Sequence, residues 1–143
     1  MNAIFEIKRL ITDEDIFYAY DTISSLRPHL IKENFIKQIR MQEETGYILF
    51  GGFNYGDLIA SAGIRIYECL AYGKNVYIDD LVINDEKRSQ GYGKKMLDWI
   101  EAYGKANGCR ELHLDSGVQR FSAHRFYFRE KFHIPYYHFS KNI

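Results

Sequence analysis

The sequence has little of several features that would assign a chain to a specialised class. Its two cysteines, Cys69 and Cys109, have no CxxC spacing, which argues against a disulfide framework or a zinc cluster. Nineteen Lys and Arg residues are balanced by nineteen Asp and Glu, so the basic footprint of a nucleic-acid-binding protein is missing. No stretch approaches the about 20 apolar residues that span a bilayer. We therefore expect no nucleic-acid partner, no membrane segment and no metal.

The length and the N-terminal pattern set the expected organisation. A chain of 143 residues is typical of one domain, so residues 1–143 are expected to form a single domain. The N-terminal residues MNAIFEIKRLITDED acquire acidic side chains early and contain no uninterrupted apolar core. This is not the pattern of a secretory signal, and a cytoplasmic location is expected.

Hydrophobic periodicity and turn residues predict a mixed α/β (α+β) fold. Thr12 and Asp15 resemble a capping box at the start of the first helix. The segments are consistent with one sheet of about six strands flanked by about four helices. Strands are expected at residues 4–10, 47–53, 58–69, 76–83, 111–115 and 134–139, and helices at 13–26, 30–44, 91–107 and 120–130.

The most informative segment lies between a buried strand and an amphipathic helix. It consists of Arg88, Ser89, Gln90, Gly91, Tyr92, Gly93 and Lys94. Two glycines allow backbone N–H groups to turn inward, and a helix N-terminus adds partial positive charge, so the segment predicts a pyrophosphate site. A P-loop is excluded because Lys95 replaces Ser or Thr, and the Rossmann pattern fails because Met96 replaces the third glycine.

This segment resembles the coenzyme A loop of the GNAT N-acetyltransferase superfamily, written Arg/Gln-x-x-Gly-x-Gly/Ala. Arg88, Gly91 and Gly93 fill that pattern, and residues 77–83 look like the fourth strand of the family. The resemblance implies a central, mostly antiparallel sheet and acetyl-CoA as acyl donor. It also implies that backbone amides from Arg88 through Lys94 hold the pyrophosphate, and that the pantetheine arm pairs with Leu81, Val82 and Ile83.

A second family motif is a helix with a small residue followed by Phe-Tyr, matched here by Ala123, Phe126 and Tyr127. The family commonly has glycine where this chain has Lys131. The resemblance makes Tyr127 the candidate acid for the departing thiolate. Asp79 or Asp80 is the candidate base for the amine. These residues interrupt an otherwise apolar strand, and alternation along a strand allows only one of them to face the acceptor; Asp80 is the favoured candidate.

Acceptor-binding candidates are Arg27, His29 and Asp115, and a backbone N–H near Leu81 or Val82 is the expected oxyanion donor. The predicted function is transfer of an acetyl group from acetyl-CoA to a primary amine of a small molecule or peptide. Two alternatives stay open: a catalytically silent CoA-binding sensor or subunit, and an acetyltransferase for protein lysines or N-termini. The aromatic C-terminal strand is a candidate homodimer contact.

Overall fold

The computed structural model describes residues 4–143, and the chain divides into two compact units, Met1–His113 and Leu114–Ile143. The first unit contains most of the sheet and the first four α-helices, and the second contains the fifth helix and the C-terminal segment. Each unit is described by itself below. The single domain expected for residues 1–143 stays a prediction.

A five-stranded sheet with the order β1-β2-β3-β4-β5 forms the centre of the fold. β1 pairs with β2, β2 with β3 and β3 with β4, and all three pairs are antiparallel. Tyr55 and Gly56 both have positive φ in the β2–β3 turn, as the twist of a two-residue hairpin loop requires. The strands are β1 (Phe5–Arg9), β2 (Ile48–Asn54), β3 (Asp57–Cys69), β4 (Gly73–Ile83) and β5 (Glu111–Leu114).

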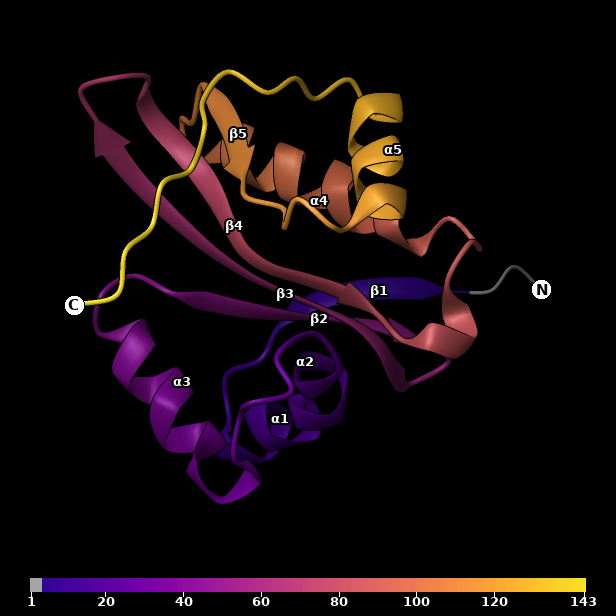
Figure 1. Ribbon diagram of the computed structural model, residues 1–143. Helices are drawn as coiled ribbons and strands as arrows, with labels where there is room; N and C mark the ends of the chain where they lie inside the picture. Colours follow the sequence, from indigo (N-terminus) through magenta and orange to yellow (C-terminus); the bar gives the residue numbers. More distant parts are fainter. Residues whose placement is uncertain (1–3) are drawn as a thin grey trace. The chain divides into compact units, whose positions relative to one another are not determined.

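Helices cover both faces of the sheet in the first unit. Figure 1 shows α1, α2 and α3 on one face and α4 on the other. Apolar side chains of the first three helices, such as Ile16, Ile23 and Ile39, form one buried cluster with Leu49 and Val82 of the sheet. The helices are α1 (Asp13–Tyr18), α2 (Tyr20–Leu26), α3 (Phe35–Glu43) and α4 (Tyr92–Ala106), with short 3₁₀ helices η1 (Lys32–Asn34) and η2 (Asp85–Lys87).

The first predicted helix begins where expected but is not continuous. Thr12 is its N-cap, and its hydroxyl accepts a hydrogen bond from the Asp15 N–H at 3.1 Å. The helix predicted for residues 13–26 is interrupted at Ala19, whose N–H bonds to the Ile16 carbonyl three residues back. This tighter bond separates α1 from α2, so residues 4–143 contain five α-helices where about four were expected.

The second unit contains α5 (Phe121–Arg129) and a C-terminal segment without regular structure. The strand predicted for residues 134–139 was wrong, and the sheet has five strands. Aromatic side chains favoured that prediction, but Pro135 lacks the N–H that a strand donates to its neighbour, and these six residues are exposed. His138 is instead bonded to Asp115, with 2.8 Å between Nδ1 and Oδ2.

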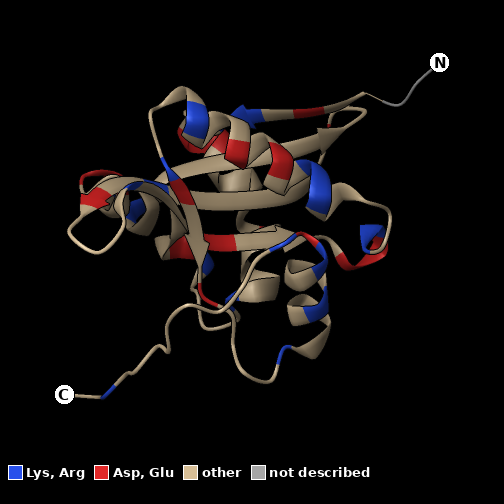
Figure 2. Ribbon diagram, turned by 90° about the horizontal axis from the view of Figure 1, so that it is seen from above, with Lys and Arg blue, Asp and Glu red and all other residues tan. Residues whose placement is uncertain are grey.

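Charged residues of both signs are interspersed over the molecule, whereas the long strands of the sheet are mostly uncharged (Figure 2). The distribution matches the zero formal net charge of the sequence. No helix within residues 4–143 combines the length and the apolarity needed to cross a membrane.

Candidate functional site

The turn before α4 leaves the start of that helix without a side-chain cap. Gly91 is the N-cap residue in the left-handed conformation, with φ +84°, and no side chain caps the helix. The first intrahelical hydrogen bond runs from the Lys95 N–H to the Gly91 carbonyl at 3.2 Å. Ser89 also has positive φ, +62°, and no atom beyond Gly91 itself and its two chain neighbours lies within 4 Å of the place where a Gly91 Cβ would be. The turn therefore has open space beside the N–H groups that begin the helix.

Side chains of this turn are bonded to nearby groups of their own segment. Arg88 pairs with Asp85 at 2.8 Å, Lys94 pairs with Asp98 at 2.9 Å, and the Gln90 amide donates to the Glu86 carbonyl. Both ion pairs are largely exposed, so they contribute little to stability. The backbone, more than these cations, gives the turn its capacity to hold an anion.

The end of β4 pairs with β3 through one edge only. It consists of Leu81, Val82 and Ile83, whose β3 partners are Ala62, Ser61 and Ala60 in that order. On the other side of β4, the strand β5 begins next to Lys74, whose carbonyl accepts from the Arg110 N–H at 2.8 Å. From that point the four residues of β5 extend about 13 Å along β4. Leu81 lies seven residues after Lys74, which is about 23 Å along the same strand. β5 therefore cannot cover the outer edge of residues 81–83.

A β-bulge places both strand carboxylates in one polar cluster. Gly63 pairs with Asp80 and Ile64 pairs with Ile78, so Asp79 is an extra residue in β4. The regular alternation assumed for the two aspartates is interrupted at this bulge, and which of them faces the acceptor stays a prediction. Both carboxylates lie near the Tyr47 hydroxyl and raise its pKa.

Asp80 is held through both carboxylate oxygens. The Tyr47 hydroxyl donates to Oδ2 at 2.8 Å, and Arg27 Nε donates to Oδ1 at 2.9 Å. Arg27 also donates through Nη2 to the Asp79 carbonyl at 2.8 Å. The Asp80 side chain is 14% exposed and that of Arg27 is 43% exposed, so the carboxylate is recessed behind a partly open guanidinium.

Asp79 has its own cation. Arg65 Nε donates to its Oδ2 at 2.7 Å, and Arg65 Nη1 donates to the Thr45 carbonyl at 3.0 Å. The Arg65 guanidinium also lies 5.5 Å from the centre of the Tyr47 ring. We call Arg27, Tyr47, Arg65, Asp79 and Asp80 the polar network. Its two carboxylates and two guanidinium groups balance in charge.

Tyr47 is the buried centre of this network. Only 1% of its surface is exposed. Burial is the main reason that the pKa of its phenol is raised well above the usual range, and the charges of Asp80 and Asp79 raise it further. The hydroxyl therefore keeps its proton and remains a donor to Asp80 throughout the neutral range.

Sequence reasoning missed Tyr47, Arg65 and Gly63. A Cβ atom on Gly63 would overlap the Tyr47 hydroxyl, so only glycine leaves room for that ring. An isolated glycine within a strand pattern can mark a bulge or a close approach, and this signal was present in residues 58–69. Nothing in the sequence pattern indicated which side chain would occupy the space.

In the second unit, the motif residues Ala123, Phe126 and Tyr127 lie on α5. Partial burial raises the pKa of the Tyr127 phenol, and the charge of Arg120 opposes this shift. The ring of Tyr127 lies 5.4 Å from that of Phe126 and 5.6 Å from that of Phe132. A phenol with a raised pKa is protonated at neutral pH, as a proton donor must be.

The exit of α5 has the geometry that a glycine would supply. Lys131 has φ +70°. Its N–H bonds to the Phe128 carbonyl, and the Phe132 N–H bonds to the Tyr127 carbonyl, both at 3.0 Å. This is the Schellman arrangement, with lysine in the left-handed position. The departure from the family pattern at Lys131 therefore leaves the turn intact.

The three predicted acceptor-binding residues have different surroundings. Arg27 belongs to the polar network, and His29 is exposed in the turn between α2 and η1. Asp115 is in the second unit and is bonded to His138. Among residues 4–143 there is no group of three or more His, Cys, Asp or Glu side chains arranged to hold a metal ion.

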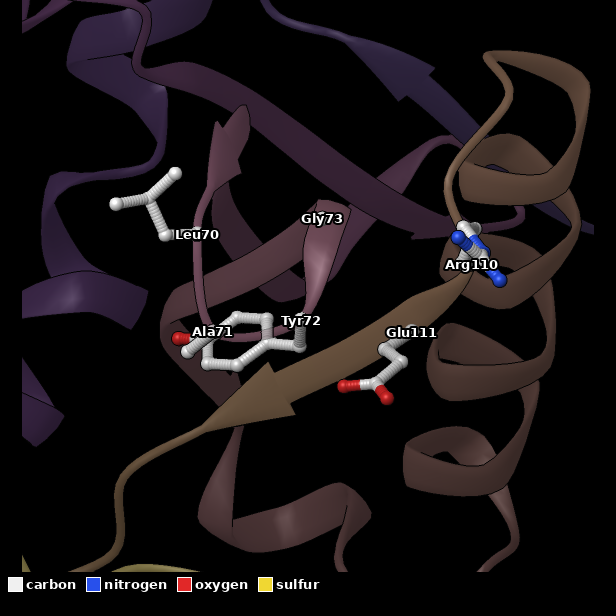
Figure 3. A pocket seen from close by; sticks show the side chains of 6 residues that line it. All are labelled: Leu70, Ala71, Tyr72, Gly73, Arg110 and Glu111. Atoms are coloured by element: carbon white, nitrogen blue, oxygen red, sulfur yellow. The ribbon is translucent and has the colours of Figure 1, made fainter.

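A shallow depression of about 520 Å³ lies elsewhere, between the β3–β4 hairpin and the start of β5 (Figure 3). Figure 3 shows the Tyr72 ring and the Glu111 carboxylate extending beside β5. His113 stacks on Tyr72 with 3.8 Å between ring centres and contacts Glu111. The depression contains no residue of the predicted site. Its lining residues are Leu70, Ala71, Tyr72, Gly73, Arg110 and Glu111.

Comparisons with known proteins agree with these features. The sequence profile described as the acetyltransferase (GNAT) family matches residues 9–133. An uncharacterized N-acetyltransferase of Bacillus subtilis, YhdJ, is 32% identical over 126 residues, which are 87% of this chain and 88% of the relative. The aminoalkylphosphonate N-acetyltransferase of Salmonella typhimurium is 33% identical over 66 residues, 46% of this chain and 43% of the relative.

Among solved structures, the aminoglycoside N-acetyltransferase AAC(6')-Iy in complex with CoA has a TM-score of 0.85. The match covers 100% of this chain and 97% of that one. At 14% sequence identity, this likeness concerns the fold alone.

Proposed function

The chain belongs to the acetyltransferase (GNAT) family, and we propose that it transfers the acetyl group of acetyl-CoA to a primary amine by direct attack in a ternary complex. The observation that carries the proposal is the uncapped N-terminus of α4 behind Gly91. Its N–H groups and the helix dipole favour an anion, and the space beside Gly91 is open. A pyrophosphate is an anion of suitable size for this turn.

The acyl donor is proposed to bind along two backbone segments of the first unit. The amides of the turn, from Arg88 through Lys94, would hold the pyrophosphate. The outer edge of Leu81, Val82 and Ile83 would accept the amide groups of pantetheine as a neighbouring strand would, because β5 is too short to cover it. Ala123 and Phe126 on α5 are proposed to contact the same donor, as the resemblance implies.

The proposed chemistry needs one proton acceptor and one proton donor. An alkyl ammonium has a pKa near 10, so a base must take its proton before nitrogen can attack. Asp80 is proposed as that base, with Asp79 as the alternative. The amine nitrogen forms a bond to the carbonyl carbon, the carbon–sulfur bond breaks, and Tyr127 gives its proton to the departing sulfur. The nitrogen loses its second proton as the amide forms, and a proton from solvent restores the Tyr127 phenol. An N–H near Leu81 or Val82 is proposed to stabilise the oxyanion.

The acceptor is proposed to be a small molecule or peptide that carries a primary amine. Arg27 uses Nε and Nη2 in the polar network, and its side chain is 43% exposed. It is therefore proposed to bind an anionic group of the acceptor, with His29 and Asp115 as further contacts. A small zwitterionic amine suits a guanidinium next to a carboxylate. The Salmonella relative is named as an aminoalkylphosphonate N-acetyltransferase, which supports this class of acceptor.

Two other functions remain as alternatives. A CoA-binding sensor or subunit would bind acetyl-CoA without turnover of any amine. An acetyltransferase for protein lysines or N-termini would acetylate peptides faster than small zwitterions. The recessed Asp80 carboxylate favours a small acceptor, because a side chain that is 14% exposed is more easily reached by a small amine than by a flat protein surface. Cytoplasmic location and a homodimer also stay predictions.

Calorimetric titration with acetyl-CoA tests the donor site through the matched variants Gly91→Glu and Gly56→Glu. The two glycines have φ of +84° and +85°, and nothing lies within 4 Å of either Cβ position, so the backbone strain of the substitutions is equal. We expect micromolar binding by the parent protein and by Gly56→Glu. Gly91→Glu should weaken binding at least tenfold, because it puts a carboxylate where the pyrophosphate binds. Equal binding by both variants would contradict the proposed site.

A further inference from the structure

The polar network surrounds the proposed base from two elements outside its own strand. Tyr47 precedes β2 directly, and Arg27 is the C-cap of α2. They reach Asp80 from different directions, one at each carboxylate oxygen, at 2.8 and 2.9 Å. A carboxylate held at both oxygens cannot rotate freely about its last bond. The remaining lone pairs therefore point in fixed directions.

We propose that Tyr47 and Arg27 are positioning residues that hold the Asp80 carboxylate in the orientation in which it receives the proton of the acceptor amine. This inference rests on the proposed function, since it concerns the base named there. Neither residue has to contact the reacting atoms for this role. The proton moves from the ammonium nitrogen to an Asp80 oxygen and then to solvent, and no other reactant is required.

Several features of the sequence and the fold are needed for this arrangement. Gly63 leaves the space that the Tyr47 hydroxyl occupies, and the bulge beside it brings Asp80 opposite Gly63. A buried phenol is costly unless its hydroxyl is hydrogen-bonded, and Asp80 satisfies it. The contact thus orders both partners. A rigid carboxylate is useful in catalysis, since misplacement by about 1 Å can cost a factor of 100 in rate.

Asp79 and Arg65 complete the charge balance around Tyr47. Two adjacent carboxylates would repel each other, but each has its own guanidinium, at 2.7 Å for Asp79 and 2.9 Å for Asp80. Arg65 also bonds to Thr45, two residues before Tyr47, and so ties the segment that carries the phenol to β3. Asp79 is therefore engaged with Arg65, which leaves Asp80 as the carboxylate positioned by Tyr47.

The test is a double-mutant cycle in kcat with Tyr47→Phe, Asp80→Asn and the double variant. Two reactions are measured: acetyl transfer to 2-aminoethylphosphonate, and hydrolysis of acetyl-CoA, in which water replaces the amine and also loses a proton. We expect Tyr47→Phe to lower kcat about tenfold, with the KM for acetyl-CoA unchanged. In the Asp80→Asn background the same change should have little further effect, because Tyr47 acts through that carboxylate.

The control is Tyr67→Phe, which removes a hydrogen-bonded phenol hydroxyl at the far end of β3. It should leave kcat unchanged. Full kcat in Tyr47→Phe, or equal losses with and without Asp80, would overturn the positioning role while leaving the proposed function in place. Full kcat in Asp80→Asn would overturn the base and the inference together. Acetyl-CoA binding without turnover in either reaction would overturn the proposed enzymatic function itself.

Discussion

At the scale of single residues, one close contact in the first unit joins a glycine to a phenol. Gly63 has the Tyr47 ring directly over its α-carbon, where a Cβ atom would overlap the hydroxyl and two ring carbons. Tyr47 is fully buried and also bonded to Asp80, so it cannot move away without losing that contact. Close packing of this kind makes the site sensitive to a single methyl group.

We expect Gly63→Ala to lower the free energy of unfolding by about 1–3 kcal/mol, the usual cost of overpacking a buried site. In a Tyr47→Ala background, the ring is gone and the same methyl group should cost much less. Urea unfolding of the four proteins measures the coupling between the two positions. Equal costs of Gly63→Ala in the two backgrounds would contradict the proposed overlap.

Sequence reasoning located the backbone turn of the candidate donor site, because its glycine motif is a local feature; the roles of its residues stay predictions. Gly91 was singled out by its spacing before a helix, and it is the left-handed N-cap of α4. Asp80 was identified as a candidate because two acids interrupt an apolar strand. Tyr47 was not, because its partners lie 16 and 33 residues away, at Gly63 and Asp80, and one tyrosine among twelve carries no signal of its own.

At the scale of elements, the end of α5 has a lysine at a position whose backbone geometry favours glycine. Lys131 is in the left-handed conformation, which costs a residue with a Cβ atom roughly 1 kcal/mol relative to glycine. Its two Schellman hydrogen bonds and the Tyr127–Phe132 contact nevertheless hold the turn. The helix exit is therefore strained in its backbone but fully bonded.

Lys131→Gly is expected to raise the free energy of unfolding by about 0.5–1 kcal/mol, because it removes the strain and keeps both hydrogen bonds. Thermal unfolding followed by circular dichroism measures the change. The control is Glu130→Gly one residue earlier, where φ is −86° and glycine relieves no strain. That variant should be neutral or less stable. A gain in Glu130→Gly equal to that in Lys131→Gly would contradict the explanation.

Most elements could be predicted because their signals are local. The Thr12 cap, the β2–β3 hairpin and the glycine before α4 each depend on a few adjacent residues. The break at Ala19 could not be predicted, since apolar periodicity runs through it unchanged. The C-terminal strand was predicted from the local residue pattern of residues 134–139, but a strand also needs a neighbour to pair with, and that is not a local property.

At the scale of the whole molecule, alkaline stability should report on the buried phenol of the network. The folded protein holds the pKa of Tyr47 well above 10, whereas in the unfolded chain the phenol ionises near its ordinary pKa of about 10. The native state therefore retains a proton that the unfolded state releases. The stabilisation is fully present below about pH 10 and is lost as the pH rises further.

Comparison with Tyr47→Phe isolates this contribution, because the variant has no proton at that position in either state. At pH 7 the variant should be less stable by about 1–2 kcal/mol, for the lost hydrogen bond to a charged group. From pH 9 to pH 11 the difference in the free energy of unfolding should shrink by about 1.4 kcal/mol, the linkage term for one retained phenol proton. Urea unfolding at each pH measures both values. A difference that stays constant over this range would mean that Tyr47 ionises normally in the folded protein. That result would contradict the placement of its hydroxyl in a buried site facing the Asp80 carboxylate.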